Sequence, residues 1–283
     1  MSKALTRGDY NERLGRVRDY IYDHLDEDLD FARLAEIACL SPHHWHRIYH
    51  ALHGETVFAT VRRLRLHRAA YALVDSAAPI EGIARRAGYE GAAAFSRAFK
   101  AAYGLSPAAY RRKGGHFNDA PPARDGRTTM RNIEIRQAPA LTVAGVPHRG
   151  PYMEIGRAFD LLHNVLTTRA LYGPGQSNVA VYFDDASITP PADCRALAGR
   201  SVAAGTNIEP PLERLDLAGG ECAVLRHLGP YAELGSAYDW LFGVWLPGSG
   251  REAADRPCYE IYLNTPMDAA PKDLITDIYL PLK

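Results

Sequence analysis

The sequence is poor in cysteine, and its four cysteines, Cys39, Cys194, Cys222 and Cys258, lie far apart without a CxxC pair. This spacing indicates neither a disulfide framework nor a zinc knuckle, so we expect no metal and no cofactor. No segment reaches the roughly 18 consecutive apolar residues that a membrane helix needs. The first fourteen residues carry five charges where a signal peptide would be apolar. We therefore expect a cytoplasmic protein without a membrane partner.

The 283 residues correspond to roughly two domains at ~100 to 200 residues each. With 47% hydrophobic and 23% charged residues, the composition excludes a disordered chain, a collagen-like repeat and a coiled coil. Two globular domains are the simplest interpretation.

A formal net charge of zero argues against nucleic acid at first sight, but the charges are unevenly distributed. Residues 1–116 hold 18 basic and 13 acidic residues, whereas residues 117–283 hold 15 and 20. Within the first half, residues 41–113 have 12 basic and 4 acidic residues. Such a basic block is typical of a polyanion-binding surface, although a solvated helical face explains charge alone equally well.

A stretch rich in Gly, Pro and small polar residues separates the halves at 114–130. It shows no apolar period, as expected of a linker. We therefore predict one domain at 1–113 and a second at 131–283.

The first domain is predicted to be all helical, with two helix-turn-helix motifs joined by a long helix. Apolar residues recur at helical spacing within 14–25 and 31–38, and again from Trp45 to a stop at Gly54. A longer helix follows at 56–75, and the short helix, turn and helix pattern then recurs from Ile80 to Gly104. The connecting helix is about 30 Å long, close to the ~34 Å between successive major-groove faces of B-DNA. One monomer would thus read two adjacent grooves.

This half resembles the DNA-binding domain of the AraC family of transcription regulators. The resemblance rests on LAEIACLSPHHWHRIYHALHG (34–54) and on IEGIARRAGYEGAAAFSRAFKAAYGLSPAAYRR (80–112). It implies that exposed positions early in each second helix contact bases: His43, His46 and Arg47 in the first motif, and Ala93, Ser96 and Arg97 in the second. An arginine binds guanine O6 and N7 in bidentate fashion, although a phosphate contact is the alternative for each. At Ala92–Ala94, methyl contact with thymine or backbone-driven docking replaces the long polar side chains that family members often carry.

Four histidines at positions 43, 46, 50 and 53 also have the helical spacing of a metal site or a protonation switch. No cysteine or carboxylate joins them on that helix, so DNA contact is the preferred interpretation.

The second half contains an internal repeat. GPYMEIGRAFDLLHNVL (150–166) matches GPYAELGSAYDWLFGVW (229–245) at nine of seventeen positions. Each copy has the pattern of a strand, a GPY turn, an amphipathic helix and two more strands, with alternating stretches at 179–183 and 259–263. We predict an α+β domain of duplicated β-α-β-β units with pseudo-twofold symmetry, and a cleft where the copies meet.

The copies differ at Glu260, which aligns with Ala180. A carboxylate amid Tyr and Trp suits a cationic or polarisable organic ligand, and a solvent-facing strand Glu beside core aromatics is the alternative. Two tryptophans, Trp240 and Trp245, replace leucines of the first copy.

This half resembles the gyrase-inhibitory-protein-like (GyrI-like) effector-binding domain, on HLGPYAELGSAYDWLFGVWLPGSGREAADRPCYEIYLNTP (227–266). In that family the Glu of the YExY strand lines the ligand pocket, which implies this role for Glu260. Tyr152, Tyr231, Trp240 and Trp245 are further ligand-contact candidates that packing would explain equally well.

Together the halves predict a transcription regulator that binds double-stranded DNA and responds to a small-molecule effector. Regulators of this kind often contact RNA polymerase, so the polymerase is a further expected partner. Two alternatives remain open: a hydrolase of small electrophiles with Glu260 as general base, and a module that sequesters a protein partner.

Overall fold

The computed structural model of the chain describes residues 7–40, 45–114, 132–186 and 188–283. Of the described residues, those up to 114 together with 163–172 form one compact unit, and those in 132–162 and 173–283 form the other. Among the helices of the described ranges, none combines the length and the apolar character needed to cross a membrane.

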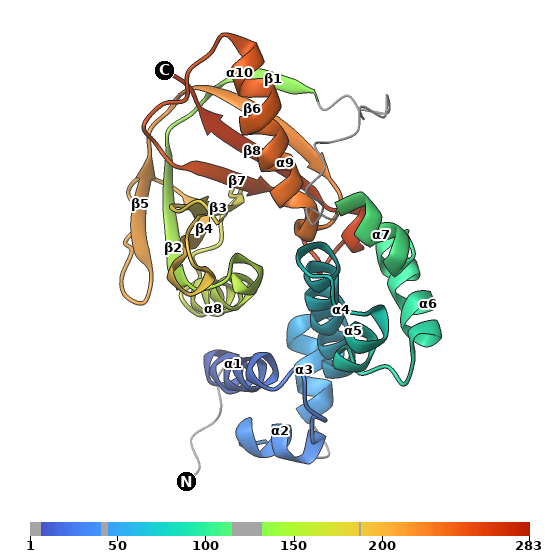
Figure 1. Cartoon of the computed structure of the whole chain (residues 1–283). Coiled ribbons are helices and arrows are strands. Elements are labelled where there is room, and N and C mark those ends of the chain that lie inside the picture. The colour runs from blue at the N-terminus through green and yellow to red at the C-terminus, as the bar shows by residue number, and fades with distance from the viewer. Residues whose placement is uncertain (1–6, 41–44, 115–131, 187) are drawn as a thin grey trace. The chain divides into compact units, whose positions relative to one another are not determined.

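The N-terminal unit is helical, as predicted. Its helices are α1 (Arg7–Asp23), α2 (Phe31–Ile37), α3 (Trp45–His53), α4 (Val57–Asp75), α5 (Ile80–Arg86), α6 (Ala92–Tyr103) and α7 (Pro107–Gly114) (Figure 1). The side chain of Asp30 accepts a hydrogen bond from the Ala32 amide and thereby caps α2. Gly54 and Gly104 follow α3 and α6 at φ 73° and 79°, a left-handed conformation that glycine adopts without strain.

The core of this unit consists of the apolar positions that the helical spacing indicates. Leu14, Val17 and Ile21 of α1 are fully buried, and Trp45 and Tyr49 of α3 pack into the same cluster. In the second motif, Phe99 stacks on Tyr103 at 4.3 Å between ring centroids and meets Tyr110 of α7 edge-on at 5.2 Å. Each helix-turn-helix motif therefore has an aromatic anchor of its own.

The C-terminal unit is a curled antiparallel sheet with helices, which agrees with the predicted α+β class. The strands are β1 (Ile133–Ala138), β2 (Leu141–Arg149), β3 (Asn178–Tyr182), β4 (Arg195–Val202), β5 (Glu213–Leu217), β6 (Gly220–Leu228), β7 (Cys258–Tyr262) and β8 (Ile275–Pro281). They are ordered β1-β6-β8-β7-β3-β4-β2-β5. The two alternating stretches, predicted at 179–183 and 259–263, form β3 and β7 one residue earlier and pair with each other in the middle of the sheet.

Two helical segments follow β2, four follow β6, and two short turns precede β4 and β8. They are η1 (Tyr152–Glu154), α8 (Gly156–Thr168), η2 (Pro191–Asp193), η3 (Tyr231–Glu233), α9 (Leu234–Trp240), the π-helical η4 (Leu241–Trp245), α10 (Leu246–Ser249) and η5 (Pro271–Asp273). Leu234, Ala237 and Leu241 pack against Leu225 and Ile278, so α9 covers one face of the sheet. Glu260 is the cross-strand partner of Ile278 and therefore belongs to this helix-covered face.

Candidate functional site

The exposed side of α6 carries the three residues predicted to contact DNA. Ala93 and Arg97 are exposed and Ser96 is partly buried, while Phe95 and Phe99 point into the core. The aromatic anchor thus fixes which side of α6 is presented. A methyl, a hydroxyl and a guanidinium lie within the first turns of the helix, which is where a recognition helix meets base edges.

The corresponding residues of the first motif lie outside the described side chains. His43 falls within 41–44, and His46 and Arg47 are in α3 without a described side-chain position. Their predicted DNA contacts therefore rest on sequence. Of the remaining histidines in this group, His50 is exposed.

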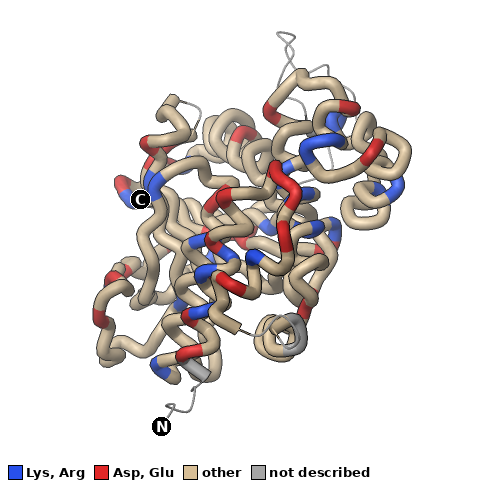
Figure 2. The backbone as a smooth tube through the Cα atoms, turned by 90° about the horizontal axis from the view of Figure 1, so that it is seen from below, with Lys and Arg blue, Asp and Glu red and all other residues tan. Residues whose placement is uncertain are grey.

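Several arginines of the basic block stabilise the helical unit itself. Arg65 donates from Nε to the carbonyl of Leu25 at 2.8 Å and from Nη2 to that of Glu27 at 2.6 Å. Arg63 pairs with Glu55 at 2.7 Å, and Arg68 pairs with Asp26 at 2.8 Å. Figure 2 likewise shows acidic and basic positions interspersed along the backbone. The net charge of residues 41–113 therefore overstates the number of cations available to phosphates.

In the C-terminal unit, Glu260 lies at the centre of a tyrosine cluster. Its carboxylate accepts hydrogen bonds from Tyr262 at 2.7 Å and Tyr182 at 3.4 Å, both at Oε2, and from Tyr238 at 3.0 Å at Oε1. The residue is 1% exposed, whereas the three tyrosines are each partly exposed. Within the described residues, no lysine, arginine or histidine bonds to this carboxylate. It is a buried acid held by hydroxyls alone.

Burial shifts the pKa values of Glu260 and of two tyrosines that bond to it. Burial raises the pKa of Glu260 to about 7, and the hydrogen bonds from Tyr262, Tyr238 and Tyr182 limit that rise because they stabilise the carboxylate. Burial and the negative charge of Glu260 raise the pKa of Tyr238 and of Tyr262 well above 10. The tyrosines therefore remain hydrogen-bond donors near neutral pH, where the carboxyl group changes charge.

Aromatic rings from both copies of the GPY turn line the cluster. Tyr152 meets Tyr182 edge-on at 4.8 Å, and Tyr231 meets Tyr262 edge-on at 5.2 Å. Phe159 of α8 adds a third ring, 5.5 Å from that of Tyr262. Two of the four further ligand-contact candidates thus touch tyrosines that bond Glu260.

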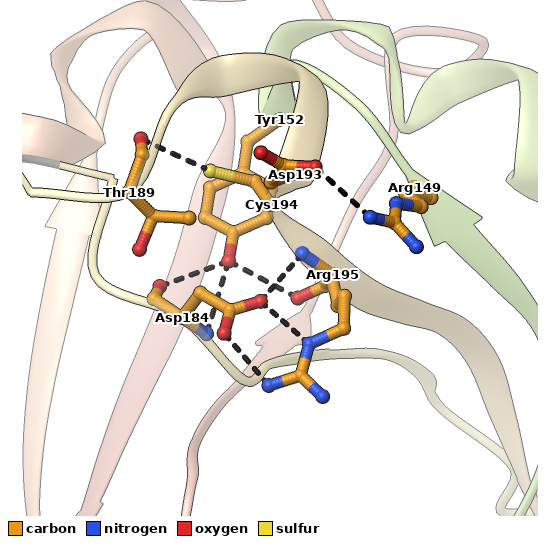
Figure 3. Close-up of polar contacts among 7 residues, drawn as sticks. All are labelled: Arg149, Tyr152, Asp184, Thr189, Asp193, Cys194 and Arg195. Carbon is orange, nitrogen blue, oxygen red and sulfur yellow. Dashed lines mark hydrogen bonds and ion pairs between the residues drawn. The ribbon is translucent and has the colours of Figure 1, made fainter.

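The hydroxyl of Tyr152 bonds to backbone groups of Asp184 and Arg195 (Figure 3). It lies 2.9 Å from the carbonyl oxygen of Asp184 and 3.1 Å from that of Arg195, and it accepts from the Asp184 amide at 3.2 Å. Asp184 in turn binds Arg195 through both carboxylate oxygens, and the hydrogen bond from that guanidinium holds the pKa of Asp184 below its usual range. Tyr152 therefore contributes an aromatic ring to the cluster, while its hydroxyl bonds to the backbone.

The two tryptophans lie apart from the carboxylate's hydrogen bonds. Trp240 and Trp245 are partly buried and pack against the cluster of Leu225, Ile278 and their neighbours. They are on α9 and η4, the same helical segment that supplies Tyr238.

Sequence reasoning did not assign a site role to Tyr182, Tyr238 or Tyr262. A signal was present for the two strand residues, because the alternation places Tyr262 on the same face as Glu260 and the repeat aligns Tyr182 with Tyr262. Nothing in the sequence indicated that the hydroxyl of Tyr238, 22 residues away, reaches the carboxylate.

Comparison with known proteins now adds to this geometry. A family model described as a GyrI-like small molecule binding domain matches residues 131–283, more than half of the chain. The chain belongs to the GyrI-like family. A second model, a helix-turn-helix domain of AraC type, matches residues 34–113. The two resemblances noted in the sequence are thereby confirmed.

Named relatives of this GyrI-like chain include DNA-binding proteins and a gyrase inhibitor. The right origin-binding protein of Escherichia coli (strain K12) is 34% identical over 124 residues, which are 42% of this chain and 43% of that protein. The chain thus spans less than half the length of that relative. The DNA gyrase inhibitor of Yersinia enterocolitica is 33% identical over 120 residues, which are 41% of this chain and 75% of the inhibitor.

Among solved structures, the C-terminal domain of EcmrR aligns with a TM-score of 0.45 and 16% identity. That alignment covers 54% of this chain and 98% of the EcmrR domain.

Proposed function

We propose that this protein is a transcription regulator whose N-terminal unit binds a promoter site through α3 and α6 and whose C-terminal unit binds a small organic cation at Glu260. The observation that carries the ligand proposal is a buried carboxylate bonded by three tyrosine hydroxyls and by no cationic side chain of the described residues. An ionised carboxylate in such a site is costly without a counter-charge. A cationic ligand supplies that charge, and the surrounding rings add cation–π attraction.

The order of the strands supports the proposal that the C-terminal unit is a duplicated β-α-β-β unit. Exchanging each strand of residues 133–202 for its counterpart in residues 213–281 reverses the order of the sheet and leaves the pattern unchanged. The pseudo-twofold axis then passes between β3 and β7, the pair in which Glu260 faces Ala180. The site would thus lie on the axis, where the copies meet.

The coupling between the two functions follows from linkage. A ligand changes DNA affinity only if it binds the DNA-competent form and the alternative form with different affinity. We therefore expect a saturating cation to shift the affinity for the operator, and the operator to shift the affinity for the cation by the same factor.

The ligand proposal is tested by titrating the full chain calorimetrically with a lipophilic monocation such as tetraphenylphosphonium. Glu260→Gln should weaken binding at least tenfold at pH 8, because it removes the buried charge and retains the shape of the side chain. Glu213→Gln is the matched control, since Glu213 is exposed on the edge strand β5 and the change in net charge is the same. Equal affinity for the wild type and Glu260→Gln would refute the proposal.

The DNA proposal is tested by selecting bound fragments from a genomic library with the purified protein. We expect an enriched site with two elements about one helical turn apart, one for each motif. Affinity should fall by about 0.9 log unit per tenfold rise in salt for each phosphate neutralised. A flat salt response or an unenriched pool would refute the proposal.

The hydrolase alternative has its own observation, since a carboxylate with a pKa of about 7 suits a general base. Mass spectrometry of a small electrophilic ester after incubation distinguishes the two. Turnover that is lost in Glu260→Gln would favour hydrolysis, and unchanged ester would favour binding.

A further inference from the structure

The two halves of the C-terminal unit differ chemically at two positions of the tyrosine cluster, and those two residues are bonded to each other. Glu260 corresponds to Ala180, and Tyr238 corresponds to Phe159. The hydroxyl of Tyr238 donates to Oε1 of Glu260 at 3.0 Å. The other tyrosine donors to the carboxylate, Tyr182 and Tyr262, correspond to each other. The hydroxyl of Tyr238 is therefore present only in the half that has the acid, whereas Tyr182 and Tyr262 supply a hydroxyl in both halves.

The two carboxylate oxygens are held by different kinds of structure. Oε2 accepts from Tyr262 and Tyr182, whose hydroxyls are also 3.1 Å apart. These two residues belong to β7 and β3, which are each paired on both sides in the middle of the sheet. Oε1 accepts from Tyr238 on α9, a helix of seven residues. Oε2 thus has rigid donors, and the donor at Oε1 depends on where one short helix lies.

The helical segment that carries Tyr238 is irregular and partly exposed beyond that residue. It continues without a break into the π-helical η4, where Leu241 is buried while Phe242 is 43% and Val244 60% exposed. The ring of Phe242 is nearly parallel to that of Tyr238, at 6.5 Å between centroids. A π-helical turn inserts a residue into the α-helical pattern and is frequent at functional sites. The irregular turn that follows directly on α9 is the element at which we expect Tyr238 to shift.

We propose that Tyr238 is the exchangeable partner of Glu260 and selects among cations: a ligand N–H group replaces its hydroxyl at Oε1. This inference rests on the proposed cation site and names the ligand class that the site prefers. A protonated amine returns a charge-assisted hydrogen bond to Oε1 when the hydroxyl leaves. A quaternary ammonium has no N–H to offer, and moving the hydroxyl would leave a buried acceptor unsatisfied, so it binds with Tyr238 in place.

The test compares two probes of similar shape, 1-naphthylmethylammonium and its N,N,N-trimethyl derivative, by calorimetry on the full chain at pH 8.5. This pH lies above the pKa of about 7, so the carboxylate of the wild type is ionised. Tyr238→Phe should bind the primary ammonium about five- to tenfold more tightly than the wild type, because the competing donor is gone, and should bind the trimethyl probe within twofold of the wild type. Phe159 shows that phenylalanine is accepted at the matching position of the other helix.

Tyr262→Phe is the control, because it removes a fixed donor from the same carboxylate. It should weaken both probes, by about fivefold. Weakening of the primary ammonium by Tyr238→Phe to the same degree would overturn the inference and make Tyr238 a fixed part of the site. Failure of the cation site itself gives a different result, namely unchanged affinity of both probes in Glu260→Gln.

Hydrogen exchange on the wild type gives a second readout that requires no variant to fold. Saturation with the primary ammonium should accelerate amide exchange within residues 234–249 at least threefold relative to saturation with the trimethyl probe. Equal or slower exchange would overturn the inference.

Discussion

Ala180 and Glu260 are directly opposite each other in the antiparallel pair of β3 and β7. Side chains that face each other in this way have Cβ atoms about 5 Å apart. Ala180 thus places only a methyl group beside the carboxylate, and the hydroxyls of Tyr182 and Tyr262 lie 3.1 Å apart. The acid in one half is therefore paired with the smallest apolar side chain in the other.

A larger side chain at Ala180 should abolish ligand binding without affecting DNA. We expect Ala180→Leu to weaken tetraphenylphosphonium binding more than tenfold and to cost about 1 to 3 kcal/mol of stability through overpacking. Ala198→Leu is the matched control, since Ala198 is an equally buried alanine on β4, which pairs with β3 on the side away from β7 and Glu260. Calorimetry and chemical unfolding measure both effects, and equal binding loss in the two variants would point to general destabilisation instead.

Cation affinity should depend on pH through Glu260. Because burial raises the pKa of this carboxyl to about 7, a cation that binds only the ionised form must displace a proton below that pH. The dissociation constant should fall about tenfold per pH unit between pH 5 and 6.5 and become constant above about pH 7.5. Glu260→Gln should remove the dependence. A pH-independent constant in the wild type would show that the acid is ionised throughout.

The same residue should make the C-terminal unit less stable at alkaline pH. The pKa of Glu260 is about 7 in the folded chain and about 4.5 in the unfolded chain, so the folded form binds the proton more tightly. Its contribution is complete below pH 4.5 and is lost as the pH rises to about 7, by about 3 kcal/mol in total.

Urea unfolding monitored by near-ultraviolet circular dichroism at pH 5 and pH 8 measures this effect. We expect Glu260→Gln to gain stability relative to the wild type between these pH values, and Glu213→Gln, which alters an exposed carboxylate, to follow the wild type. A constant difference between Glu260→Gln and the wild type would contradict the assignment.

In the DNA-binding unit, the exposed Arg97 of α6 should read a base. If its guanidinium binds guanine in bidentate fashion, Arg97→Lys retains the charge and loses the second hydrogen bond, so both Arg97→Lys and Arg97→Ala should cost about 1 to 3 kcal/mol on the selected operator and relax preference at one position. Fluorescence anisotropy with operator variants measures both. Full activity of Arg97→Lys would instead assign the side chain to a phosphate.

The sequence was most informative where a pattern repeats within one element. Helical spacing located the buried faces of α1, α3 and α6, because burying one side of a helix requires apolar residues every three or four positions. The mismatch between Ala180 and Glu260 in an otherwise similar repeat drew attention to the acid. The boundaries of β3 and β7 differed from the prediction by one residue, a difference that is common at the ends of elements.

The hydroxyl of Tyr238 could not be predicted to bond the acid because it comes from another element, whereas alternation and the repeat did indicate Tyr262 and Tyr182. Tyr182 is 78 residues from Glu260, and Tyr238 reaches it from a helix whose position depends on packing against the sheet. The arginines of α4 gave a similar result. Their number indicated a surface for polyanions, but Arg65 bonds to two carbonyl groups 38 and 40 residues away. Nothing in the sequence around Arg65 indicates that its guanidinium binds these distant carbonyl groups.

The order of the strands also determines how the C-terminal unit comes apart. β1 pairs with β6, and β5 pairs with β2. The first strand of the stretch 133–202 is thus paired with a strand of the stretch 213–281, and the first strand of 213–281 is paired with a strand of 133–202. The two stretches are therefore joined by reciprocal strand pairing. A break in the segment between β4 and β5 would yield two fragments that each lack an edge strand and regain it only by recombining. Folding, and any stabilisation by a ligand at the centre, is therefore shared by both stretches as one cooperative event.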